Sequence, residues 1–241
     1  MVKINFLHQN LLIENIHSMK KINSQWHSNY DFIYEIPSLI LSYPHGIFTD
    51  SFKPGVSFYK LRFEDVCSFL GHVCLCGAGG YKIAQLALEN LKKDSPILEK
   101  DKFSLISSRD HTISDVVAFI LGCSRRNDLQ KNQYFIDDNI KANKREYHYQ
   151  IAYPSIKKAV EIIYKKHLLV GNERMDVLWE IEKALDKKPE TVSDQDKKLY
   201  QNAMVTMVKD VLFDRKPGLF EVQSISYPLF EMKVELMKGN I

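Results

Sequence analysis

The sequence has no uninterrupted apolar run of about 18 residues, which is the length that a transmembrane helix needs. We therefore expect no membrane-spanning helix and no membrane partner. The first residues also lack the apolar core and the small-residue cleavage site of a signal peptide, so we expect them to belong to the mature protein.

A strong excess of charge is also missing. The 33 Lys and Arg residues nearly balance the 30 Asp and Glu residues, which leaves a formal net charge of +3. The lysines are scattered along the chain and form no basic stripe. A nucleic-acid partner is therefore not expected.

Cysteine is scarce, with four residues in a chain of 241. Two of the four stand only two positions apart, and so few cysteines do not form a disulfide framework in a chain of this length. Because reduced thiols are typical of the cytoplasm, we expect a cytoplasmic protein. The hydrophobic content of 45% and the charged content of 26% are ordinary for a globular protein with a sizeable core.

The hydrophobic pattern predicts an α+β fold, in which helices pack on a mixed or antiparallel sheet. Helical spacing predicts helices over 10–21, 64–70, 81–93, 115–121, 154–166, 175–185 and 193–212. Alternation predicts strands over 102–108, 134–136, 146–152 and 219–226. Aromatic residues and prolines favour extended segments over 30–43, and the glycines predict a compact loop over 72–80.

The most informative stretch runs from 63 to 91. Three of the four cysteines (Cys67, Cys74 and Cys76) and His72 lie within ten positions, and three glycines and an amphipathic helical pattern follow them. The first turn of a helix carries unpaired N–H groups and the positive end of the helix dipole, which lower the pKa of a nearby thiol. This stretch therefore places thiols where the thiolate, the form that binds metals and attacks electrophiles, is favoured.

Two motifs in this region resemble those of the FmdE family, which takes its name from a component of formylmethanofuran dehydrogenase. The run Phe-Leu-Gly-His-Val-Cys at 69–74, with Gly-Tyr at 80–81, is similar to the family signature Phe-His-Gly-His-x-Cys-Pro-Gly followed by Gly-Tyr. The run from Asp115 to Gly122-Cys123-Ser124 is similar to the family's Asp-Ala-Ile-Gln-x-x-x-Gly-Cys-Thr. A weaker similarity, at 218–225, is to a late Leu-Phe-x-Val strand.

The resemblance implies an α+β core over 63–230 with a metal-associated His/Cys site. Residues 1–62 are then an N-terminal extension packed on the core, and 231–241 are a C-terminal tail. The family is often dimeric, so a homodimer is expected. No cysteine follows Cys123, so we expect no zinc-finger tail of the kind that some members carry.

The chain also departs from the family pattern. Leu70 stands where the family has its first His, and Leu75 and Cys76 replace Pro and Gly. Thr112 occupies the position of a family Cys, with His111 beside it. Since two potential ligands are lost, the sequence leaves open whether the family site is still active.

A transition-metal site is nevertheless the leading hypothesis for this region. His72 and Cys74 are its centre, because imidazole and thiolate suit Zn²⁺ or another transition metal. Cys76, His111 and Cys123 are further candidate ligands. The competing interpretation is that these cysteines are simply buried apolar residues, which we favour for Cys67.

A metal with few protein ligands keeps an open coordination position, where a bound water becomes more acidic. Cys74, His72 and Asp115 are therefore candidate catalytic residues acting on a small-molecule substrate. Asp115 has a second interpretation, because a carboxylate in the first turn of a helix is stabilised by the helix dipole alone. The glycines at 77, 79 and 80 match neither the P-loop nor the dinucleotide fingerprint, so no nucleotide is expected.

These observations leave three classes of function open. The first is a metal-binding protein, zinc being the expected ion, that acts enzymatically on a small molecule. The second is a non-enzymatic metal carrier, sensor or accessory subunit of a metalloenzyme, which should lack a deep organic pocket. The third is a thiol redox protein that uses Cys74 and Cys76.

Overall fold

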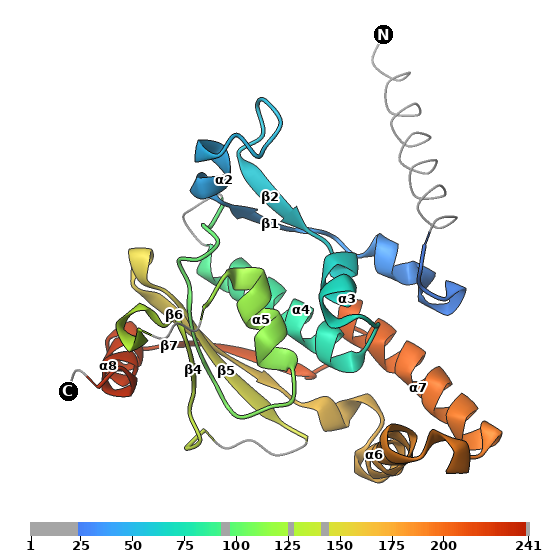
Figure 1. Cartoon of the computed structure of the whole chain (residues 1–241). Coiled ribbons are helices and arrows are strands. Elements are labelled where there is room, and N and C mark those ends of the chain that lie inside the picture. Colours follow the sequence, from blue (N-terminus) through green and yellow to red (C-terminus); the bar gives the residue numbers. More distant parts are fainter. Residues whose placement is uncertain (1–23, 93–96, 125–127, 141–144, 240–241) are drawn as a thin grey trace.

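The computed structural model describes residues 24–92, 97–124, 128–140 and 145–239. Their fold is α+β, as the sequence predicts (Figure 1). The helices are α2 (Pro44–Phe48), α3 (Phe63–Leu70), α4 (Leu75–Leu91), α5 (Ile113–Leu121), α6 (Asn172–Lys187), α7 (Asp194–Leu212) and α8 (Tyr227–Met237). Short 3₁₀ helices are η1 (Ser28–Glu35), η2 (Leu129–Lys131), η3 (Pro154–Ile156), η4 (Lys166–Leu169) and η5 (Pro189–Thr191).

The strands form two sheets. The two-stranded sheet pairs β1 (Leu39–Ser42) with β2 (Phe58–Leu61). The five-stranded sheet has the order β4-β3-β5-β6-β7, in which β3 runs parallel to β4 and all other neighbours are antiparallel. Its strands are β3 (Ser104–Ser107), β4 (Tyr134–Ile136), β5 (Tyr147–Tyr153), β6 (Lys158–Tyr164) and β7 (Phe220–Ile225).

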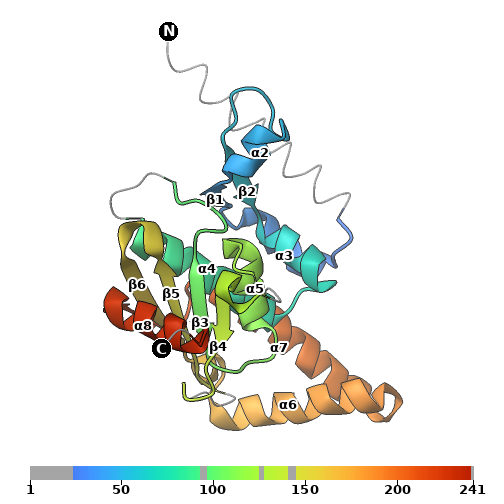
Figure 2. The ribbon, with the colours of Figure 1, turned by 60° about the vertical axis from the view of Figure 1, so that its left-hand side comes forward.

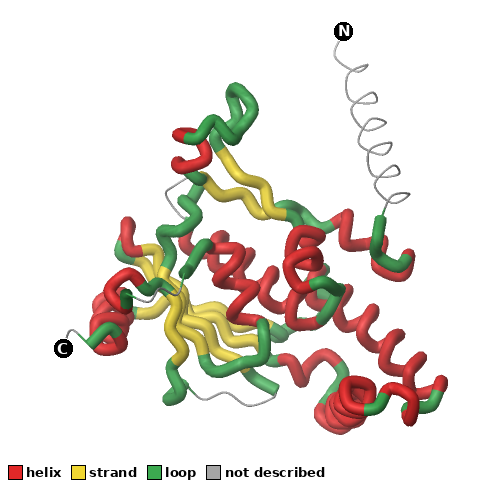
Figure 3. Tube along the Cα trace, in the orientation of Figure 1, coloured by secondary structure: helices red, strands yellow, loops and turns green. Residues whose placement is uncertain are grey.

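Helix α4 lies at the centre of the molecule. One side of it packs on β5 and β6, and its other sides contact α3, α5 and α7. The opposite face of the five-stranded sheet is covered by α8, which closes a second, smaller core (Figures 2 and 3). The residues of α4 from Gly77 to Ala84 are all buried. The site described below is thus built on the most enclosed helix of the fold.

The glycines of α4 let neighbouring elements approach its backbone closely. A Cβ at Gly79 would lie 2.8 Å from the ring of Tyr164 on β6. A Cβ at Gly80 would lie 2.6 Å from Val116 on α5. Both distances are too short for a real contact, so these two positions require glycine because of packing and not because of a turn.

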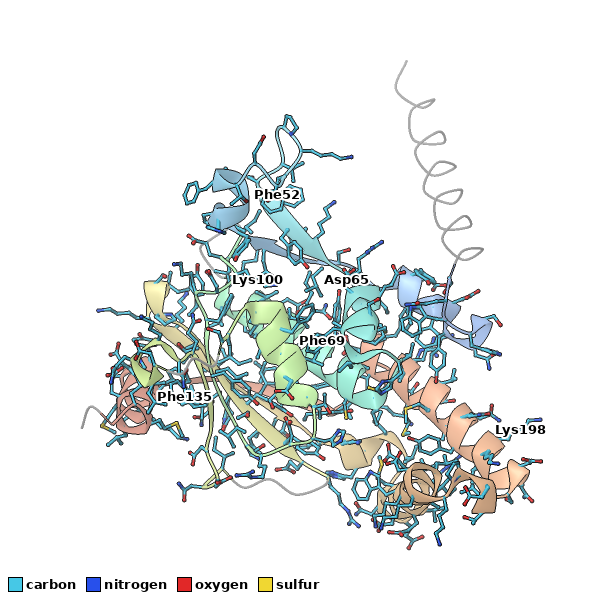
Figure 4. All side chains as sticks on the ribbon, viewed as in Figure 1. Phe52, Asp65, Phe69, Lys100, Phe135 and Lys198 are labelled. Atoms are coloured by element: carbon cyan, nitrogen blue, oxygen red, sulfur yellow. The ribbon has the colours of Figure 1, made fainter. Side chains whose placement is uncertain are left out.

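The section before α3 contributes to the same main core as the later elements. Ile33 of η1, Leu41 of β1 and Leu61 of β2 are buried among residues of α3 and α4. The β1–β2 hairpin extends away from the five-stranded sheet and carries α2 at its outer end (Figure 1). Phe52 lies in this outer part and packs against Gly46 (Figure 4).

Most predicted elements of the later chain are confirmed. Helices α3, α5, α6 and α7 and strands β3, β4, β5 and β7 agree with the sequence pattern to within a few residues. Gly71 and Gly122 end α3 and α5 in the left-handed conformation, and Ser193 caps α7 through its side chain.

Three predicted segments are wrong, in whole or in part. The loop expected over 72–80 is helical from Leu75 onward, because its glycines serve close packing and not a turn. The helix expected over 154–166 is the turn η3 followed by β6, whose apolar residues are buried from both sides and so show no clear alternation. Of the range 30–43, expected as extended, residues 30–35 lie in η1, whereas 39–42 form the strand β1.

The end of the chain is helical. Pro228 lies in the first turn of α8, and this helix continues to Met237, into the range 231–241. The helix predicted over 10–21 lies outside the described residues. Of the helices that the structure describes, none combines the length and the apolar character needed to cross a bilayer.

Candidate functional site

The site begins at the turn between α3 and α4. Gly71 ends α3 with a φ of 78°, and three residues later Cys74 has extended backbone with a φ of −145°. Cys74 is the N-cap of α4, and its Sγ accepts the backbone N–H of Gly77 at 3.3 Å. The sulfur thus occupies the place that a Ser or Asp oxygen takes in an ordinary helix cap.

This position favours the thiolate of Cys74. Hydrogen bonding from the Cys76 thiol, and then from the backbone N–H groups of Gly77 and Cys76, lowers the pKa of Cys74 to about 7, although burial acts to raise it. The same pairing, together with burial, raises the pKa of Cys76 well above its usual value. The pair therefore divides its roles, with Cys74 as the thiolate and Cys76 as the proton donor.

The two thiols line a cavity of about 240 Å³. Its floor is the start of α4, and its walls come from η1, η4, α6 and α7. Most wall residues are aromatic or thioether side chains, while the polar ones can orient a ligand. The lining residues are Tyr30, His72, Val73, Cys74, Leu75, Cys76, Lys166, Met175, Leu178, Trp179, Glu182, Tyr200, Gln201, Met204 and Met207.

His72 lies at the exposed rim of this cavity. Its Nδ1 donates to the backbone oxygen of Leu70 at 3.0 Å. Since a carbonyl can only accept, the neutral ring carries its proton on Nδ1 and presents a lone pair on Nε2. A backbone carbonyl fixes metal-binding histidines in many proteins in this way.

A second cavity, of about 280 Å³, adjoins the first. Cys76 lines both cavities, and His111 lines only the second. Electrostatic interaction with Lys166, and then with His111, opposes this rise of the Cys76 pKa. Nδ1 of His111 lies 2.6 Å from the hydroxyl of Thr112. The structure therefore brings His111 to the far side of the thiol pair from His72.

Cys123 and Asp115 lie elsewhere. Both line a shallow surface depression beside α5, together with Phe69 and other residues, and neither lines the cavities of the thiol pair. Phe69 of α3 stacks on Phe119 of α5, with a distance of 4.5 Å between the ring centroids, and so packs the two helices together (Figure 4). Burial raises the pKa of the Cys123 thiol.

The carboxylate that serves the start of α5 is Asp110, which sequence analysis missed. Asp110 accepts the backbone N–H of Ser114 at 3.0 Å and its hydroxyl at 2.9 Å. It also accepts the hydroxyl of buried Tyr149 at 2.6 Å. Ser114 is therefore held by Asp110, and Asp115 is an exposed residue of the first turn.

Cys67 is buried in α3, as the sequence pattern suggests. Burial, followed by the charge of Glu64, raises its pKa to about 12. A neutral, buried thiol of this kind acts as an apolar residue.

The sequence did not predict the residues that face the thiols from the other side of the cavities. Lys166 comes from η4, Trp179 and Glu182 come from α6, and Tyr200 comes from α7. Each is an ordinary residue of an amphipathic helix or turn, with no motif around it. Only the tertiary packing of α6 and α7 against the start of α4 brings them together.

A zinc-type ion fits part of this donor set. Cys74 and Cys76 provide two neighbouring sulfur ligands of the kind that Zn²⁺ prefers, and His72 is at the rim of the same cavity. Within the part of the chain that the structure describes, no three His, Cys, Asp or Glu side chains converge as a ready-made metal group. The thiol pair can therefore supply two ligands, and further ligands would come from His72, from His111 on the Cys76 side, from water or from a bound molecule.

Comparison with known proteins gives one match. The family model described as "FmdE, Molybdenum formylmethanofuran dehydrogenase operon" matches residues 69–214, which is more than half of the chain. The matched range includes both thiols and α6 and α7, together with most of the residues that line the two cavities. A search of curated proteins and a search of solved structures found no match.

Proposed function

The chain belongs to the FmdE family, and from this premise we propose that it binds a thiophilic metal ion, with zinc as the favoured ion, through Cys74 and Cys76. One observation carries the proposal: the two thiols form a proton-sharing pair at the start of α4, where the pKa of Cys74 is lowered to about 7. A thiolate is the form that binds metals, so about half of the Cys74 side chains are ready at neutral pH. His72 is the third candidate ligand, through Nε2.

We also propose that the bound ion serves a reaction on a small molecule. The support is the cavity of about 240 Å³ beside the thiols, with its Trp179 and Tyr200 walls and its polar Lys166 and Glu182. A simple carrier needs no such space. A bound metal ion would supply Lewis acidity at this position, while Trp179 and Tyr200 would hold the substrate against the thiol pair and exclude water from it.

The description of the family refers to a molybdenum enzyme operon, which supports a role linked to metalloenzymes. A non-enzymatic accessory role is therefore the second candidate. The two candidates differ in the use of the cavity, since an accessory protein that only binds metal gains nothing from Trp179. Replacing this residue with alanine should leave metal affinity unchanged in both cases and abolish small-molecule binding only in the enzymatic one.

Metal content tests the proposal. Protein purified under reducing, chelator-free conditions and loaded with Zn²⁺ should retain about one ion per chain after desalting. The variant with both Cys74→Ala and Cys76→Ala should retain none while its circular dichroism remains that of the native fold. Cys123→Ala is the matched control, because it removes a thiol outside the cavity and should keep the ion. Equal zinc retention in the double variant and the parent would refute the proposed site.

A further inference from the structure

The two cavities beside the thiols share one wall. Four residues line both of them: Cys76, Lys166, Trp179 and Glu182. The first cavity is rich in methionine and aromatic side chains, and the second adds Lys183 and Asp186. A ligand that spans this wall therefore meets an apolar region with reactive sulfur at one end and charged groups at the other.

Lys166 is the unusual member of this wall. Its ammonium group lies 5.9 Å from the centre of the Trp179 ring. It forms no ion pair with any carboxylate in the described ranges 24–92, 97–124, 128–140 and 145–239, although its neighbour Lys165 pairs with Glu221. Glu182 lines the same cavities but accepts the hydroxyl of Tyr200 at 2.8 Å. The structure thus holds the ammonium group of Lys166 beside the thiol pair with no direct carboxylate partner among the described residues.

We propose that Lys166 binds the carboxylate of a small organic monoanion, so that the rest of the molecule reaches Cys74 and Cys76. This inference rests on the proposed function, because it names the substrate class of the same site. A monoanion suits the charges better than a phosphate dianion. The carboxylates of Glu182 and Asp186 line the same space, and Lys183 is already paired with Glu180, so a second negative charge on the ligand would be repelled.

The size of the cavities supports a small ligand. Their volumes of about 240 Å³ and 280 Å³ lie just below the range of roughly 300–1,000 Å³ that is usual for drug-sized ligands. The face of Trp179 can stack on a planar group, while the ammonium of Lys166 takes the anionic end. The site therefore fits a compact carboxylate with an electrophilic or metal-binding centre a few bonds away.

Two alkylating reagents of matched size and leaving group test the proposal on reduced, metal-free protein. Iodoacetate is an anion and iodoacetamide is neutral, and in both cases the Cys74 thiolate forms the new S–C bond while iodide leaves. The ratio of their rates at Cys74, followed by peptide mass spectrometry, cancels the thiolate fraction and reports the charge preference of the cavity. We expect Lys166→Met to lower the iodoacetate-to-iodoacetamide ratio by about fivefold or more at low salt.

The controls separate a specific effect from a general one. Lys165→Met removes the same charge one residue away, outside both cavities, and should leave the ratio unchanged. Lys166→Arg keeps the charge and should keep most of the preference. An unchanged ratio in Lys166→Met would overturn the inference while leaving the thiol site intact. A wild-type Cys74 that neither reagent modifies would overturn the thiolate site itself, and the substrate inference with it.

Discussion

Cys76→Ala should change the reactivity of Cys74 in a way that depends on pH. The largest cause of the low Cys74 pKa is hydrogen bonding from the Cys76 thiol, and burial, which acts in the opposite direction, is the next largest. Without Cys76, burial outweighs the remaining backbone N–H groups. The pKa of Cys74 should then return from about 7 to at least its ordinary value of about 8.5.

The size of the effect follows from two opposing factors. At pH 7 the thiolate fraction falls from about one half to roughly 3%, a loss of about 16-fold. A more basic thiolate is also a better nucleophile, which returns about fivefold over 1.5 pKa units. Cys76→Ala should therefore react with iodoacetamide about threefold more slowly at pH 7, but about fivefold faster near pH 10, with the two profiles crossing near pH 8.

The assay is the rate of Cys74 carbamidomethylation between pH 5.5 and 10, followed by peptide mass spectrometry. Cys67 and Cys123 should stay silent in the native state, because burial raises the pKa of both thiols. Cys76→Ser is the matched control, because the serine hydroxyl can donate to Cys74 as the thiol does. This variant should keep the low midpoint of the pH–rate profile of Cys74. A midpoint near pH 7 in Cys76→Ala, or an equal shift in Cys76→Ser, would refute the reasoning.

Two further predictions concern stability. Asp214→Asn should lower the free energy of unfolding by about 1–2 kcal/mol in urea titrations, because Lys82, only 4% exposed, loses its carboxylate partner. The control is Asp138→Asn, which breaks an ion pair on the open surface and should leave the urea midpoint unchanged. Equal effects of the two substitutions would contradict the account. Gly80→Ala should cost about 1–3 kcal/mol, because its Cβ would overlap the backbone and side chain of α5. At Gly77 the one short contact of a Cβ would be with the flexible end of Leu70, while Val66 and the Cys74 sulfur lie at ordinary contact distance. Gly77→Ala should therefore cost much less, and a similar loss for both variants would show that helix packing is not the cause.

Where the sequence pattern was local, it predicted the fold well. Helices α6 and α7 follow from apolar spacing, and Ser193 marks the start of α7. Strands β5 and β7 follow from alternation. The predictions fail where tertiary packing, and not the local sequence, determines the conformation of a residue. The glycines of α4 indicated a loop from the sequence alone, yet they are required because Tyr164 and Val116 lie against that helix.

The candidate site was predictable in part for the same reason. Cys74, Cys76 and His72 are close in sequence, so their shared cavity follows from their spacing and the start of a helix. Lys166 and Trp179 come from distant elements and carry no local signal. Cys123, placed near the site through the second motif, lines a different surface depression beside α5. Asp110 was missed because its role depends on contact with Tyr149 of a distant strand.

The most direct test of the central claim is the absorption spectrum of the protein titrated with Co²⁺, which substitutes for Zn²⁺ and reports its ligands. Coordination by Cys74 and Cys76 predicts sulfur-to-cobalt charge-transfer bands that saturate at one ion per chain with the intensity of two thiolates. These bands should be absent from the folded Cys74→Ala, Cys76→Ala variant and present in Cys123→Ala. Cobalt binding without charge-transfer bands, or equal bands in the double variant, would contradict the account.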